Sequence, residues 1–119
     1  MIEQLVSRVF YTRNAMHLAH WSEQSGYRHE TLGALYKSIV DDLDAVVEAF
    51  QGCFTLIKKV PPRPGPMEVD NVEKHLMEEV EWIDENRERI SKDFSAIENL
   101  VDTLSGTYLT ALYKLRNLK

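Results

Sequence analysis

Histidines that could bind a metal gather early in this 119-residue sequence. His17 and His20 are three residues apart, so they share a face if their segment is helical. His29 follows after a short turn at Ser25-Gly26, so the imidazoles could converge at one end of a helical hairpin. These residues form a first candidate half-site.

Two carboxylates form a second candidate half-site. Asp44 and Glu48 are four residues apart and therefore project from one side of a helix. Carboxylate oxygen combined with imidazole nitrogen suits iron, manganese or zinc. The plainer alternative is that the histidines are bundle-end residues hydrogen-bonded to carbonyls or acids, and that Asp44 and Glu48 belong to a solvated surface.

His29 and Asp44 cannot reach one ion within a single chain. Fifteen positions separate them, which is roughly 22 Å along an α-helix. A two-fold dimer with these helices antiparallel would bring the histidine end of one copy to the carboxylate end of the other. We therefore expect a homodimer or higher homo-oligomer in which two of the three histidines of one copy share a metal with Asp44 and Glu48 of the other.

The segments that carry these residues are predicted to be four helices. Apolar residues recur with the helical period over approximately 2–24, 27–51, 68–90 and 94–118. The linker over 52–66 holds four residues that exclude a helix interior, Pro61, Pro62, Pro64 and Pro66. Two helices in a hairpin, a long connection and two further helices are the layout of a four-helix bundle. The sequence therefore predicts one all-α domain over residues 1–119.

Three local features carry further expectations. Asp70, followed by Glu73, predicts the cap of the third helix. Trp21 and Trp82 are expected to be packing residues. The third predicted helix contains a run of acidic residues, which predicts a solvent-exposed surface. These residues are Glu78, Glu79, Glu81, Asp84 and Glu85.

Composition and charge exclude several classes of protein. The 44% hydrophobic and 28% charged residues are typical of a folded globular chain. A net charge of -5 without a Lys/Arg cluster argues against nucleic-acid binding. No apolar stretch approaches the roughly 18–20 residues of a membrane span, and the start lacks a signal-peptide profile. The lone Cys53 excludes an intrachain disulfide. We expect a cytoplasmic protein without a membrane partner.

The candidate metal ligands and some of their neighbours resemble the sequence pattern of Dps, the DNA-binding protein from starved cells. The matching residues are His20-Trp21, Gly26, His29, Tyr36, Asp44 and Glu48. The resemblance covers about thirty residues. It implies a ferritin-like four-helix bundle with a ferroxidase site between two subunits. Iron or another divalent metal would bind there, and Fe(II) would be oxidised, with His20, His29, Asp44 and Glu48 as the ligands and His17 as the substitute for His20.

The sequence also departs from Dps. Gly33 stands where Dps carries an acid four residues after its second histidine, so one iron ligand is absent. The turn before His29 is shorter, which leaves open whether His17 or His20 is the ligand. No lysine-rich tail is present, and DNA binding of the Dps kind is not expected. The Glu-x-x-His motif of di-iron bundles is missing, which excludes a di-iron centre within one subunit.

Over nearly its full length the chain is similar to a family of small phage-encoded proteins of unknown function. The similarity lies in residues 17–20, His29, the stretch YKSIVDDLDAVVEAFQG over 36–52, and residues 112–115. It implies the cytoplasm of a bacterial host. The alternative function is a noncatalytic helical-bundle oligomer that acts as a phage scaffold or binds a host protein. The sequence does not decide whether the protein is an enzyme.

Overall fold

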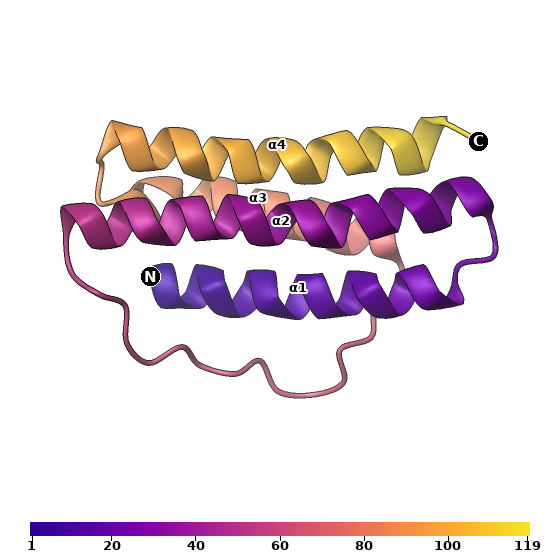
Figure 1. The fold of residues 1–119 in the computed structure, drawn as a ribbon, viewed down its shortest axis with the longest axis horizontal. Coiled ribbons are helices and arrows are strands. Elements are labelled where there is room, and N and C mark those ends of the chain that lie inside the picture. Colours follow the sequence, from indigo (N-terminus) through magenta and orange to yellow (C-terminus); the bar gives the residue numbers. More distant parts are fainter.

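The computed structural model describes residues 1–119 as four α-helices without a β-strand (Figure 1). The helices are α1 (Ile2–Ser22), α2 (Gly26–Cys53), α3 (Val72–Ser91) and α4 (Ser95–Asn117). The all-α prediction is therefore confirmed. The connection between α2 and α3 spans 54–71 and lies later than the expected 52–66. Helix α3 starts later because Asn71, and not Asp70, caps it by accepting a 3.0 Å hydrogen bond from the Lys74 amide.

Each helix packs mainly against two neighbours. Helix α1 contacts α2 and α3, and α4 contacts the same two helices. Helices α1 and α4 run in one direction and α2 and α3 in the other (Figure 1). The connection crosses the length of the bundle, so α3 starts at the end where α1 finishes. The result is a four-helix bundle with one long crossover and antiparallel neighbours.

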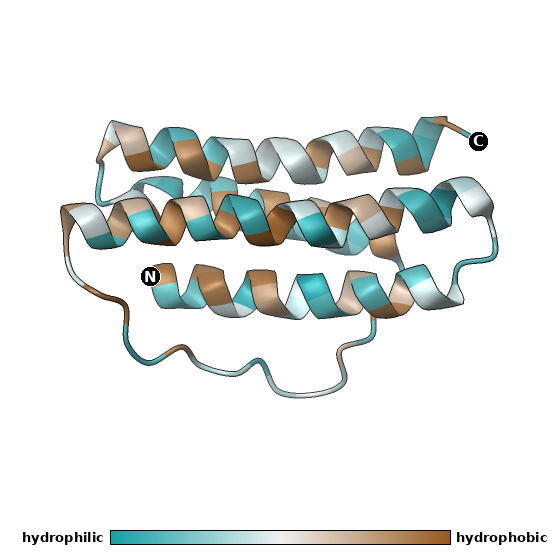
Figure 2. Ribbon diagram, viewed as in Figure 1, coloured by the Kyte–Doolittle hydropathy of each residue, from teal (hydrophilic) through white to brown (hydrophobic).

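Apolar side chains from all four helices meet in one core. Leu5, Ile39, Leu76 and Leu104, one from each helix, are completely buried. Figure 2 shows apolar and polar residues recurring along each helix, which is how an amphipathic helix keeps one side inside. No helix combines the length and the apolar character that crossing a membrane would require.

A buried polar cluster lies where the connection passes over α1 and α3. Glu79 is only 3% exposed and forms an ion pair with Arg8 of α1. Arg63 of the connection lies 3.9 Å from the other carboxylate oxygen. Thr12 Oγ1 lies 3.4 Å from Glu79 and 2.9 Å from His75 Nε2. The expectation that Glu79 is solvated is wrong, because its charge is matched by arginines from two other segments.

Tyr11 attaches the connection to α1. Its hydroxyl donates a 2.9 Å hydrogen bond to the Pro66 carbonyl. The Arg63 guanidinium lies 4.0 Å from the centre of the Tyr11 ring, within cation–π range. The connection therefore lies against α1.

Candidate metal centre

His20 near the end of α1 and His29 near the start of α2 pack face to face across the hairpin. Their ring centroids are 3.7 Å apart and their planes differ by 20°. Nδ1 of His20 donates to the His29 carbonyl at 2.6 Å, and Nδ1 of His29 donates to the His20 carbonyl at 2.6 Å. The turn that allows this is short, since Ser25 already caps α2 through the Arg28 amide. The structure thus brings these two histidines together.

The two hydrogen bonds fix the tautomer of both rings. A carbonyl oxygen only accepts, so each Nδ1 carries the proton and each neutral ring keeps a lone pair on Nε2. Neither Nε2 has a hydrogen-bond partner. The only buried side-chain polar atom without a partner is Arg8 Nε, so both Nε2 atoms reach solvent. A neutral imidazole whose Nδ1 is held by a carbonyl is the state in which histidine binds a metal.

Gly33, one turn after His29, provides the space for this pair. An ideal Cβ at Gly33 would lie 2.9 Å from Cε1 and 3.1 Å from Nδ1 of His20. The His20 ring therefore occupies the volume that any side chain at this position would need. The missing acid has a physical explanation, because the ring and an acidic side chain exclude each other.

His17 lies beside the pair and has a different neighbour. Its ring stacks on Tyr36 with centroids 4.2 Å apart, and it lies 6.4 Å from the His20 ring. Desolvation, followed by the positive charge of Arg13, lowers the pKa of His17. His20 therefore forms the reciprocal pair with His29, whereas His17 packs on Tyr36.

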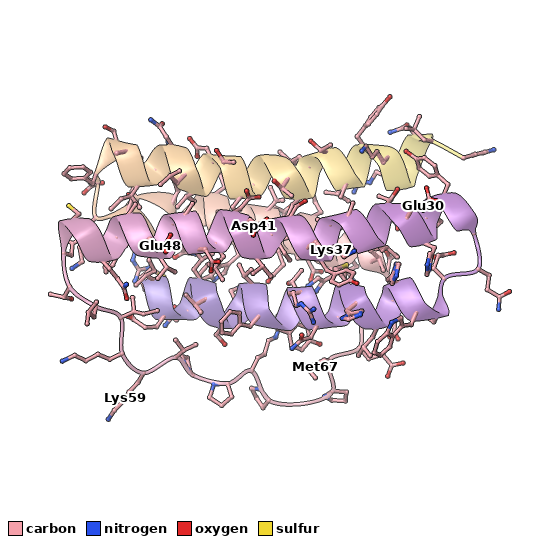
Figure 3. All side chains as sticks on the ribbon, viewed as in Figure 1. Glu30, Lys37, Asp41, Glu48, Lys59 and Met67 are labelled. Atoms are coloured by element: carbon pink, nitrogen blue, oxygen red, sulfur yellow. The ribbon has the colours of Figure 1, made fainter.

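Asp44 and Glu48 remain apart from the histidines within one protomer. Both side chains are exposed, and neither forms an ion pair or a hydrogen bond. Figure 3 shows Glu30, the neighbour of His29, and Glu48 towards opposite ends of α2. No three histidine, cysteine or acidic side chains of one protomer converge as metal ligands would. The predicted ligands therefore lie in two separate groups on one protomer.

The surface around the histidine pair exposes large aromatic side chains. Trp21 is 67% exposed and Phe10 is 52% exposed, and their spacing places them on the same side of α1. The expectation that Trp21 is a packing residue of the bundle is wrong, because its aromatic contact is the His17 ring at 4.5 Å. In the sequence, the only sign that Phe10 is exposed is its position outside the apolar stripe of its helix. Trp21 lies next to the histidine pair in sequence, whereas Phe10 lies beside residues 60–63 of the connection.

We call the exposed surface of α1 and α2 the hairpin face. Its residues include Phe10, His17, Trp21, Lys37, Asp44 and Glu48, of which Lys37 and Glu48 are labelled in Figure 3. It carries the histidine pair towards one end and the two free carboxylates towards the other.

The profile of a protein family, described as "Family of unknown function (DUF5856)", matches residues 20–115. The match covers most of the chain and includes His20, His29, Asp44 and Glu48, whereas His17 precedes it. Comparison with curated proteins and with solved structures gives no significant match.

Proposed function

The chain belongs to this family of unknown function, and from its geometry we propose that two copies associate through the hairpin face and bind iron, or another divalent metal, between them. The observation that carries the proposal is the reciprocal pairing of His20 and His29. It leaves the Nε2 atom of each ring without a hydrogen-bond partner at one end of the hairpin face, in the tautomer that binds a metal when the ring is neutral.

A second copy would complete the ligand set. In an antiparallel two-fold pairing of the α2 helices, Asp44 and Glu48 of the second copy approach the histidine pair, and the reverse holds at a symmetry-related site. Burial of the exposed Trp21 and Phe10 would favour this association.

The connectivity of the bundle supports a ferritin-like relationship. A single long crossover between the second and third helices is the arrangement of ferritin-like bundles, in which metals bind between facing helices. In this protein the facing helices that offer donors would belong to two copies.

Each proposed ligand has a distinct role. His20 and His29 would bind the metal through Nε2, which requires their stacked rings to turn so that the two in-plane lone pairs meet at one ion. Asp44 and Glu48 would neutralise its charge and supply oxygen donors. With Fe(II) as the substrate and dissolved dioxygen as the oxidant, a site of this kind would support transfer of one electron from Fe(II) to dioxygen, giving Fe(III) and superoxide.

A noncatalytic oligomer, serving as a phage scaffold or binding a host protein, is the second candidate. It is favoured by the lack of any converging ligand set within one protomer. The exposed aromatic residues would serve this function equally well, so metal binding separates the two candidates.

The test measures metal content and oligomeric state together. Purified protein is loaded with Fe(II) without oxygen, desalted and analysed for bound iron, and its mass is measured by light scattering. We expect a dimer or larger assembly with stoichiometric iron that is lost in His29→Ala and in Glu48→Ala but kept in Glu85→Ala, a control at an exposed and unpaired glutamate of α3. Wild-type protein that forms the same oligomer without iron would refute metal binding and support the noncatalytic candidate.

A further inference from the structure

A buried histidine belongs to the polar cluster over which the connection passes. His75 of α3 is only 8% exposed. Its Nε2 atom lies 2.9 Å from Thr12 Oγ1, which in turn lies 3.4 Å from a Glu79 carboxylate oxygen. Arg8 and Arg63 form ion pairs with the same carboxylate. One negative charge therefore already faces two positive charges while His75 is neutral.

The two arginines of the cluster differ in how firmly they are held. Arg8 belongs to a helix and makes the closer ion pair with Glu79, whereas the Arg63 guanidinium lies 3.9 Å from the carboxylate. The Arg63 side chain is also the more exposed, and it belongs to the connection, which has no helix to hold it in place. Arg63 is therefore the cation that the cluster can release into water most readily.

Arg63 provides the polar attachment of the middle of the connection. Its guanidinium pairs with the buried carboxylate and lies over the Tyr11 ring, 4.0 Å from its centre. No other residue of 58–64 forms an ion pair or a hydrogen bond with the helices. Tyr11 holds the following part separately, through its hydrogen bond to the Pro66 carbonyl. Loss of the Arg63 contacts would therefore free residues 58–64, which we call the strap, and leave Pro66 attached.

We infer that the strap is a pH-sensitive device, in which protonation of His75 displaces Arg63 from Glu79 and lets residues 58–64 leave the bundle. A protonated His75 would place three positive charges around one carboxylate, and the repulsion is relieved when Arg63 moves into water. Opening also lets water reach the imidazolium, whose charge is unfavourable in a buried position. These steps involve none of the proposed metal ligands, so the device goes beyond the proposed function and does not depend on it.

The charges around His75 give the direction of the pH dependence. Burial lowers the pKa of His75 most; Arg63 and Arg8 lower it further, whereas Glu79 and Glu78 raise it. The titratable and charged groups of the cluster come from α1, α3, α4 and the connection, and they are Arg8, Tyr11, Glu78, Glu79, Tyr108 and Arg63. Opening removes both the burial and the charge of Arg63, so the open form has the higher His75 pKa. The closed strap is therefore favoured above pH 6.5, the ordinary value, and the open strap gains as pH falls below it.

A spin label on the strap measures its release. Lys59 is exposed and points away from the helices (Figure 3), so a label there disturbs none of the contacts that hold the strap. Lys59→Cys in a Cys53→Ser background provides a single labelling site, since Cys53 is the only native cysteine. Electron paramagnetic resonance between pH 8 and 5 gives the ratio of mobile to immobile label, and circular dichroism checks that the helices persist. This ratio should rise at least about 5-fold, the lower end of typical coupling between two sites, with a midpoint below pH 6.5.

Three variants of the labelled protein separate the device from a general effect of acid. His75→Gln keeps a hydrogen-bonding group beside Thr12 but cannot gain a charge, so its label should stay immobile throughout. Arg63→Gln should be mobile at every pH, because the strap has lost its polar attachment. Lys58→Gln removes an exposed and unpaired charge from the strap and should titrate like the wild type. A wild-type label that stays immobile at pH 5, or a His75→Gln label that loosens as much as the wild type, would overturn the inference.

Discussion

Replacing Gly33 with alanine tests the geometry of the histidine pair without any metal. Alanine is favoured over glycine inside a helix by about 0.8–1.0 kcal/mol, so this substitution stabilises a helix at an unobstructed position. At Gly33 the new methyl group would lie 2.9 Å from His20 Cε1, and overpacking of this kind costs about 1–3 kcal/mol. A displaced ring also weakens its hydrogen bond to the His29 carbonyl, which is worth about 1 kcal/mol. The expected net loss in the free energy of unfolding is about 1–3 kcal/mol.

Thermal unfolding followed by circular dichroism, with EDTA present, measures this loss. In a chain of this size 1 kcal/mol corresponds to roughly 4 °C in Tm. Gly33→Ala should therefore lower Tm by roughly 4–12 °C. Gly106→Ala, with open space around its Cβ, should raise Tm by roughly 4 °C.

A double variant shows whether His20 causes the effect. In a His20→Ala background the steric conflict is gone, so Gly33→Ala should become stabilising by about 1 kcal/mol. Should Gly33→Ala alone raise Tm as much as Gly106→Ala does, the stacked arrangement of His20 and His29 would be refuted.

Three further predictions concern the buried cluster and the hairpin face. Glu79→Gln should lower the free energy of unfolding by about 2 kcal/mol in urea titrations. This loss is smaller than the roughly 3–5 kcal/mol for breaking a fully buried pair, because Arg8 is partly exposed. A loss no larger than that of the exposed control Glu78→Gln would contradict the buried pairing. Desolvation lowers the pKa of His75 below its ordinary value of 6.5. As pH drops below 6.5 the unfolded chain therefore takes up a proton before the folded chain does, and the free energy of unfolding should fall. His75→Gln should reduce this pH dependence in urea titrations at several pH values. Trp21→Ala should leave Tm of the monomer within about 2 °C but weaken self-association in sedimentation experiments, and unchanged association would exclude Trp21 from the interface.

The arrangement of helices was accessible from sequence because its signals are local. Apolar residues at helical spacing predict four helices, and the prolines from Pro61 to Pro66 predict the connection. The start of α3 was misplaced because Asp70 and Asn71 are both good capping residues. Only the folded structure shows that Asn71 is the cap, because its side chain accepts a hydrogen bond from the Lys74 amide.

The site was accessible only in part, because its decisive contacts join different helices. Spacing predicts that His20 and His29 lie near one hairpin end, but not that each Nδ1 donates to the carbonyl of the other residue. The presence of Glu79 in an acidic run hides its pairing with Arg8, a residue 71 positions away. Whether a tryptophan such as Trp21 lies in the core or on the surface depends on which side of α1 the neighbouring helices cover.

Complementation between two variants tests the intersubunit metal site most directly. One variant lacks the histidine pair (His20→Ala with His29→Ala), the other lacks the carboxylates (Asp44→Asn with Glu48→Gln), and neither should bind Co(II) alone. A mixed dimer has one complete site, with histidines from the second variant and carboxylates from the first. Because random pairing makes about half of the dimers mixed, co-expression of both should restore about a quarter of the wild-type cobalt content. No restored cobalt, in a sample whose mixed dimers are seen by native mass spectrometry, would contradict a site shared between two copies.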